Sequence, residues 1–151
     1  MISDQQFLKI IDATPLVSID LILENQQGKI LLGKRNNRPA QNYWFVPGGR
    51  IRKNEKLADA IKRISSTELG TEITLNNSQL LGAFDHIYDD NFSGSDDINT
   101  HYVVLAYKVR MKDDFKIVAD DQHSEKRWWH IKDLLDAPDV HQNTKTYFLN
   151  T

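Results

Sequence analysis

A glycine pair ahead of a helix-forming segment is the part of this sequence best suited to bind a metal and a phosphate group. Gly48 and Gly49 precede "RIRKNEKLADAIKRISSTELG", and glycine lets the backbone come close to a ligand and point a carbonyl at it. Glu68 continues, by one step of four, the apolar stripe that includes Leu57 and Ile64, where an idle charge would be costly. Mg²⁺ prefers such hard oxygen ligands, completed by phosphate and water. From the helix alone, an ordinary amphipathic helix with a solvated Glu68 is the slightly better interpretation.

The sequence around this segment predicts strands before and after one central helix, and these elements must position it. The predicted strands cover residues 16–24, 29–35, 42–49, 79–88, 101–110 and 125–131, and the first two form a hairpin through "NQQG". The predicted helices cover residues 3–12, 54–68, 131–136 and 142–150. This order predicts an α/β fold, with a mixed sheet and helices packed on it.

Capping residues predict where two of these helices begin and end. Ser3 or Asp4 can cap the first helix, and Asn54 can cap the central one. Gly70 is well placed to terminate the central helix. Pro47 stops the short strand that precedes it.

Composition restricts the class of protein and of partner. The chain has 151 residues, 40% of them hydrophobic and 26% charged, so one domain covering residues 1–151 is expected. A formal net charge of −2 gives no support for nucleic acid or membrane as the main partner. The absence of cysteine excludes disulfides and thiolate metal sites. With no basic leader and no long apolar run, a cytoplasmic protein is expected.

The spacing after the glycine pair resembles the Nudix box, whose usual form is G-x5-E-x7-R-E-U-x-E-E-x-G-U, where U is a bulky aliphatic residue. Gly49, Glu55, Arg63, Glu68 and Gly70 match it. Isoleucine at 64 and threonine at 67 replace two of the three clustered glutamates, and serine at 65 replaces the aliphatic residue. This departure puts ordinary Nudix pyrophosphohydrolase activity in doubt.

The departure itself resembles one branch of that superfamily, the GDP-mannose mannosyl hydrolases. The stretches that carry this resemblance are "ATPLVSID", "NRPAQNYWFVPGGR", "HIYDDNFSGSD", "THYVVL", "DQHSEKRWW" and "VHQNTKTYF". The resemblance implies an α/β/α Nudix sandwich with a central mixed β-sheet. It also implies Mg²⁺-dependent hydrolysis of GDP-mannose, or of GDP-glucose, to GDP and hexose by water attack on the anomeric carbon with inversion. A conventional pyrophosphohydrolase giving a nucleoside monophosphate and a sugar phosphate, and a non-catalytic nucleotide-sugar-binding module, are the alternatives.

The same resemblance implies a metal site and a base. The Mg²⁺ ligands would be the Gly48 carbonyl, the Glu68 carboxylate and the side-chain oxygen of Gln122. His123 would be the general base, since imidazole accepts a proton near neutral pH. His86 would lie near the sugar and the leaving group, although a histidine of the core or the surface remains an alternative.

Further residues would bind the two ends of the substrate. Arg35 and Arg50 would neutralise the departing GDP, because guanidinium groups form paired hydrogen bonds with phosphate. Arg63 would orient Glu68 or a neighbouring loop carbonyl. Asp20 would bind a sugar hydroxyl, and Tyr102 would either bind phosphate or pack in the sheet.

The resemblance further implies a homodimer. In it, the N-terminal segment of one subunit, from Ile2 to Phe7, would shape the nucleotide site of the other. A short terminal helix packed on its own domain is the simpler alternative.

Overall fold

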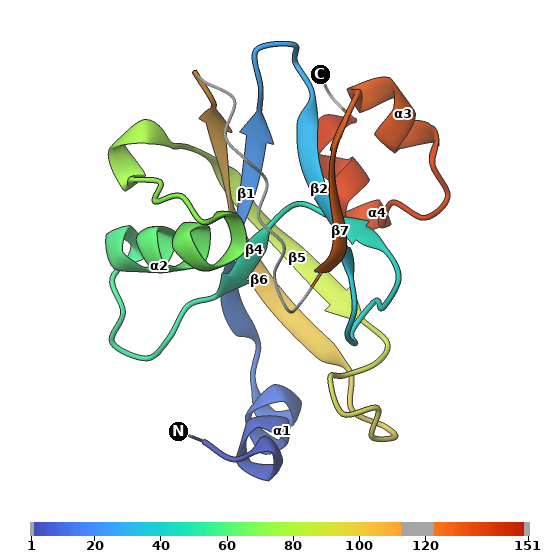
Figure 1. Ribbon diagram of the computed structural model, residues 1–151. Helices are drawn as coiled ribbons and strands as arrows, with labels where there is room; N and C mark the ends of the chain where they lie inside the picture. Colours follow the sequence, from blue (N-terminus) through green and yellow to red (C-terminus); the bar gives the residue numbers. More distant parts are fainter. Residues whose placement is uncertain (1, 113–122, 150–151) are drawn as a thin grey trace.

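The computed structural model describes residues 2–112 and 123–149, and its centre is a mixed sheet with helices on both faces (Figure 1). The seven strands run in the order β3-β2-β1-β6-β5, with β4 beside β1 and β7 beside β2. β1 pairs with β6 in parallel and with β2 and β4 antiparallel. The predicted α/β fold with a mixed sheet is confirmed. The strands are β1 (Leu16–Glu24), β2 (Ile30–Arg35), β3 (Trp44–Phe45), β4 (Gly48–Arg50), β5 (Gln79–Tyr88), β6 (Thr100–Arg110) and β7 (His123–Trp129).

The helices form two groups on opposite sides of the sheet, and α1 extends from one end of the molecule (Figure 1). No helix in the described ranges is long and apolar enough to cross a membrane. The helices are α1 (Asp4–Ala13), α2 (Leu57–Leu69), α3 (Ile131–Asp136) and α4 (Gln142–Lys145), with the 3-10 turns η1 (Leu75–Asn77) and η2 (Thr146–Phe148).

The alternation of side chains along β1 separates two cores. Ile19 and Leu21 are fully buried against α2, where they pack with Ile61. Ile22 faces the other way and packs with Leu134 of α3 and with the C-terminal residues. Since successive residues of a strand point to opposite faces, Asp20 lies on the same face as Ile22, toward the C-terminal helices.

Three of the predicted helix ends can be compared with the structure, and one is wrong. Ser3 forms a capping box with Gln6 at the start of α1, and Gly70 ends α2 in the left-handed conformation with φ 70°. Asn54 does not cap α2, because it has a φ of 66° and the helix begins at Leu57 after Lys56. The turn at 52–55 is closed by its own hydrogen bonds, and these hold the chain out of the helix.

Other boundaries also differ from the predictions. The predicted strand 42–49 is two short strands, β3 and β4, with Pro47 between them. The predicted helix 142–150 is shorter, since α4 gives way to η2 at Thr146. β7 begins at His123, and Ile131 belongs to α3.

Candidate active site

A cleft of about 440 Å³ gathers most of the predicted site residues. Its wall takes residues from six strands and from α1, so the sheet order is what brings them together. The predicted residues in this wall are Phe7, Asp20, Arg35, Gly48, Arg50, His86 and Tyr102.

Two arginines bring positive charge to the cleft wall. The Arg35 guanidinium donates from Nε to the Pro39 carbonyl at 3.0 Å and lies 5.9 Å from the Phe45 ring centroid. Arg50 lies over the Phe7 ring at 4.5 Å. Burial raises the pKa of Tyr102, while the positive charges of Arg35 and Arg50 oppose that rise, so both arginines lie near the phenol. This arrangement suits a diphosphate, which needs charge and hydrogen-bond donors together.

Two residues of the cleft wall, Asp20 and His86, join the phenol of Tyr147 in one chain of contacts. The Tyr147 hydroxyl donates to Asp20 Oδ2 at 2.6 Å and lies 3.3 Å from His86 Nε2. Burial raises the pKa of Asp20 to about 7, against the opposing effects of Tyr147 and Arg35. Burial, helped by His141, lowers the pKa of His86 to about 4, so its imidazole is neutral at pH 7. These are groups that hydrogen-bond sugar hydroxyls.

The lack of a side chain at Gly48 makes room for the Asp20 carboxylate. The two residues are partners across β1 and β4. A Cβ on Gly48 would lie 2.5 Å from Asp20 Oδ1 and 2.5 Å from the Ile19 carbonyl. A side chain larger than hydrogen at 48 therefore cannot coexist with this position of the carboxylate, which explains the need for glycine there.

The residues expected to hold Mg²⁺ fit the ion by their chemistry. The Pro47 carbonyl accepts from Leu21 of β1, so the next carbonyl along, that of Gly48, points away from β1. Ile64 packs against Gly49, at 3.1 Å from where a Cβ would lie. Glu68, 4% exposed, follows Ile64 by one helical turn on the same face. A backbone carbonyl and a carboxylate are hard oxygen donors of the kind that Mg²⁺ selects.

Other parts of the expected metal site and base lie outside what the structure describes. Across residues 2–112 and 123–149, no three histidine or acidic side chains gather as a metal site. Gln122 lies outside these ranges, and so does the side chain of His123. The backbone of His123 opens β7 directly opposite Arg35 of β2. The roles given to Gln122 and His123 therefore stay predictions.

Arg63 supports the segment that bears Arg50. Its guanidinium donates to Glu55 Oε2 at 2.7 Å and to the Arg50 carbonyl at 2.8 Å. The carbonyl that Arg63 contacts is thus that of Arg50, the last residue of β4, and the role predicted for Arg63 in the site stays a prediction.

The N-terminal segment reaches the cleft of its own chain. Phe7 lies 5.3 Å from Phe92, ring centroid to centroid, and both line the cleft. Ile2 is 44% exposed and lies outside the wall. A contribution of this segment to a second subunit stays a prediction.

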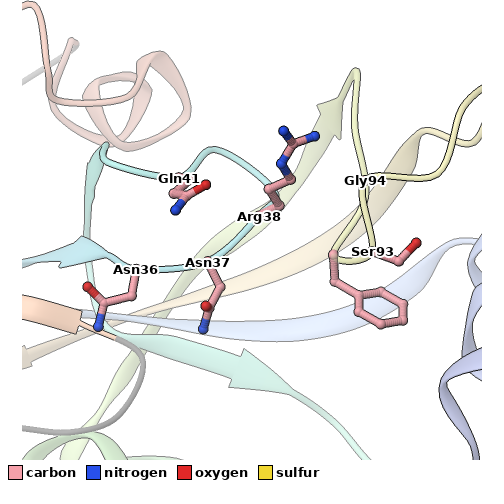
Figure 2. Close-up of a pocket in the computed structure, with 7 residues that line it drawn as sticks. Asn36, Asn37, Arg38, Gln41, Ser93 and Gly94 are labelled. Carbon is pink, nitrogen blue, oxygen red and sulfur yellow. The ribbon is translucent and has the colours of Figure 1, made fainter.

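A second hollow of about 660 Å³ adjoins the cleft, and the two share Asn37, Arg38 and Phe92 (Figure 2). Figure 2 shows the 36–41 loop on one side and Ser93 and Gly94 on the other. The side chain of the buried Asn91 donates to the carbonyls of Ser95 and Ile98 at 2.9 and 2.7 Å. These two hydrogen bonds hold the loop that carries Phe92 beside the cleft. The hollow continues the cleft beyond Arg38, and its wall includes the amide side chains of Asn36, Asn37 and Gln41.

Several residues of the cleft were missed by the sequence analysis. Phe45, Tyr88 and Phe92 are aromatic residues of its wall, and Tyr147 contacts the wall residues Asp20 and His86. Tyr147 lies inside the predicted helix 142–150, and no role was predicted for it. The sequence carries no local signal for its contact with a residue 127 positions away.

Known proteins share the domain family, part of the sequence and the fold of this chain. The NUDIX domain family matches residues 14–149. The low-salt glycan biosynthesis protein Agl8 of Haloferax volcanii is 42% identical over 125 residues, which are 82% of this chain and 76% of that protein. The structure of a MutT protein from Methanosarcina mazei Go1 has a TM-score of 0.71 at 18% identity, covering 91% of this chain and 94% of its own. The NUDIX domain of Shewanella oneidensis NrtR, solved with ADP ribose, has a TM-score of 0.65 at 22% identity, covering 97% and 94%.

The fold and the matched family together define the class of protein: this chain belongs to the Nudix family. Its similarity to Agl8 is consistent with the GDP-mannose hydrolase branch.

Proposed function

We propose that this protein hydrolyses GDP-mannose to GDP and mannose with Mg²⁺. The observation that carries the proposal is that one cleft holds two kinds of group. Arg35 and Arg50 supply positive charge, and Asp20 and His86 supply groups that hydrogen-bond hydroxyls. A nucleoside diphosphate sugar needs both kinds, since it joins anionic phosphates to a neutral polyol.

The bond that breaks is the one between the anomeric carbon and the β-phosphate oxygen. A water oxygen bonds to the carbon while the electron pair of the breaking bond leaves with GDP, and His123 takes the proton of the water. Mg²⁺, held by Gly48, Glu68 and Gln122, would supply positive charge to the diphosphate. Arg35 and Arg50 add to that charge stabilisation. One displacement inverts the configuration at carbon.

The altered Nudix box supports attack at carbon. Attack at phosphorus uses clustered carboxylates to organise metal and water. Here Ile64 and Ser65 occupy two of the box positions and are buried, and Ser65 donates to the Ile61 carbonyl at 2.7 Å. Glu68 is the one carboxylate kept at the clustered positions, which suits a site whose work at the phosphates is limited to the leaving group.

Two relatives support the substrate class. The Haloferax volcanii relative is named for glycan biosynthesis, in which activated sugars are consumed. A domain with this fold was solved with ADP ribose, a sugar joined to a nucleoside diphosphate.

Hydrolysis in ¹⁸O-labelled water tests the proposal. With Mg²⁺ and GDP-mannose, the label is expected in mannose and not in GDP, and the β anomer is expected first. GDP-glucose in parallel measures the sugar preference, and a reaction with EDTA is the control for the metal. Label in GDP would establish attack at the β-phosphorus and overturn attack at carbon, and GMP with mannose phosphate would establish a conventional pyrophosphohydrolase. Binding without turnover would establish a non-catalytic module.

The base is tested by His123→Ala. General-base assistance supplies about 10²–10⁴-fold, and a loss of that size is expected at neutral pH, with partial relief at high pH. The exposed His130, beside α3, gives a matched control as His130→Ala. An unchanged rate in His123→Ala would give the base role to another residue, with His86 the next candidate.

We further propose that the protein acts as a homodimer to which the segment from Ile2 to Phe7 contributes across subunits. Light scattering gives the mass, and a mixture of two inactive variants, Phe7→Ala and Glu68→Gln, tests the sharing of sites. Recovery of activity on mixing is expected. A monomer, or no recovery, would leave Phe7 as a residue of its own cleft.

A further inference from the structure

Tyr147 joins two cleft residues that come from different strands. Asp20 lies on β1 and His86 on β5, and the Tyr147 hydroxyl is 2.6 Å from Asp20 Oδ2 and 3.3 Å from His86 Nε2. Its ring is 8% exposed and meets Phe84 edge-on at 4.9 Å between centroids. The hydroxyl is thus held by packing at a fixed point between the carboxyl and the imidazole.

The C-terminal segment that carries Tyr147 is fixed to the edge of the sheet. The Trp44 amide donates to the Asp139 carbonyl at 2.8 Å, and the His141 amide donates to the Trp44 carbonyl at 3.2 Å. His141 also caps α4 by accepting from the Asn143 amide at 3.0 Å. These contacts set the position of η2, and therefore of the phenol, without help from the cleft residues.

A phenol has one proton, and this decides the direction of both hydrogen bonds when Asp20 is ionised. The proton lies in the 2.6 Å hydrogen bond from the Tyr147 hydroxyl to Asp20 Oδ2, because this bond is short and charge-assisted. The Tyr147 oxygen is then an acceptor, so His86 donates to it from Nε2 and keeps Nδ1 as an acceptor. Asp20 Oδ1, over Gly48, stays available to the cleft.

We propose that Tyr147 is a positioning residue for sugar binding in the cleft, fixing the Asp20 carboxylate and the His86 tautomer through one hydroxyl group. This inference rests on the proposed function, since it assigns the sugar to Asp20 and His86. Tyr147 acts through Asp20 and His86, because its hydroxyl is occupied by them.

A purely structural role for Tyr147 is the competing explanation, since it belongs to the core of the C-terminal helices. Tyr107, 4% exposed in the core on the α2 side, offers a matched tyrosine away from the cleft. Tyr147→Phe and Tyr107→Phe each remove one buried hydroxyl and keep the ring.

The kinetic test is a double-mutant cycle of Tyr147→Phe and Asp20→Ala on the intact chain with GDP-mannose. Loss of a hydrogen bond to a charged group predicts that Tyr147→Phe lowers kcat by about 10- to 100-fold with little change in KM. In the Asp20→Ala background the same substitution should lower kcat by less, because the hydrogen bond to Asp20 is already gone and only the one with His86 remains to be lost. Tyr107→Phe should leave kcat unchanged. Equal effects of Tyr147→Phe in both backgrounds, or an equal loss in Tyr107→Phe, would overturn the proposal.

A spectroscopic test needs no turnover. In ¹⁵N-labelled protein at a pH where Asp20 is ionised, long-range ¹H–¹⁵N spectra should show His86 with its proton on Nε2. Tyr147→Phe should shift the tautomer balance, with circular dichroism unchanged. A proton on Nδ1 in the wild type would overturn the proposal. The products formed by the wild type decide the proposed function separately, so failure of the one is distinguishable from failure of the other.

Discussion

Arg63 and Glu55 form a two-pronged ion pair that ties α2 to the turn before it. Arg63 Nε lies 2.7 Å from Glu55 Oε2, and Nη2 lies 2.9 Å from Oε1. The same Nη2 reaches the Arg50 carbonyl at 2.8 Å, and Glu55 accepts from the Arg52 amide at 3.0 Å. The pair thereby holds the strand that carries the glycine pair and Arg50 against the helix that carries Glu68.

Acid should weaken this ion pair and with it the fold. The hydrogen bond from Arg63 lowers the pKa of Glu55 from 4.5 to about 2. The stability that follows is present above pH 4.5 and is lost as the pH falls toward 2, because protonation removes the charge. Glu55→Gln should lower the free energy of unfolding by about 1–3 kcal/mol at pH 7 and by much less near pH 2.5. Urea unfolding at both pH values measures this, with the exposed Glu72→Gln as control; an equal loss at both would contradict the ionic origin.

Asp20 should titrate near neutral pH in the metal-free protein. Burial raises its pKa from 3.8 to about 7, so between pH 4 and 7 the folded protein holds a proton that the unfolded chain has released. Stability from this group therefore falls as the pH rises through that window. Carboxyl ¹³C spectra in EDTA should show a midpoint near 7, which Tyr147→Phe should raise, because the hydrogen bond from Tyr147 favours the ionised form. A wild-type midpoint near 4 would contradict the effect of burial.

Loss of either cleft arginine should slow the chemical step. Charge on the departing GDP is greatest in the transition state, so Arg35→Ala and Arg50→Ala should each lower kcat by about 10- to 100-fold. Steady-state kinetics with GDP-mannose measure this, and Arg110→Ala, at the exposed end of β6, is the control. If only KM rises, the arginines bind phosphate in the ground state alone.

Glu68→Gln should sharply reduce Mg²⁺-dependent turnover while keeping the fold, since the two side chains have nearly the same shape. The expected signs are a lower kcat at limiting Mg²⁺ and an unchanged circular dichroism spectrum. Glu72→Gln, just beyond α2, provides the matched control. Wild-type activity of the Glu68 variant at limiting Mg²⁺ would show that Glu68 is not a metal ligand.

Much of the local structure follows from the sequence. The hairpin of β1 and β2, a cap at Ser3 or Asp4 and the end of α2 at Gly70 were predicted from residues that lie next to one another. Asn54 shows the limit of such signals. Its side chain suits a cap, but the contacts of Glu55 with Arg52 and Arg63 fix a turn there instead.

The sequence by itself determined the family and the types of residue in the site, because the Nudix box is a set of spacings along one helix and the turn before it. Only the tertiary structure decided that Asp20, Gly48, His86 and Tyr147 meet. They come from β1, β4, β5 and η2. The parallel pairing of β1 with β6 places β6 between β1, which carries Asp20, and β5, which carries His86. Tyr147 reaches Asp20 because alternation along β1 turns residue 20 toward the C-terminal helices. Such a contact joins residues far apart in the chain, and no local pattern encodes it.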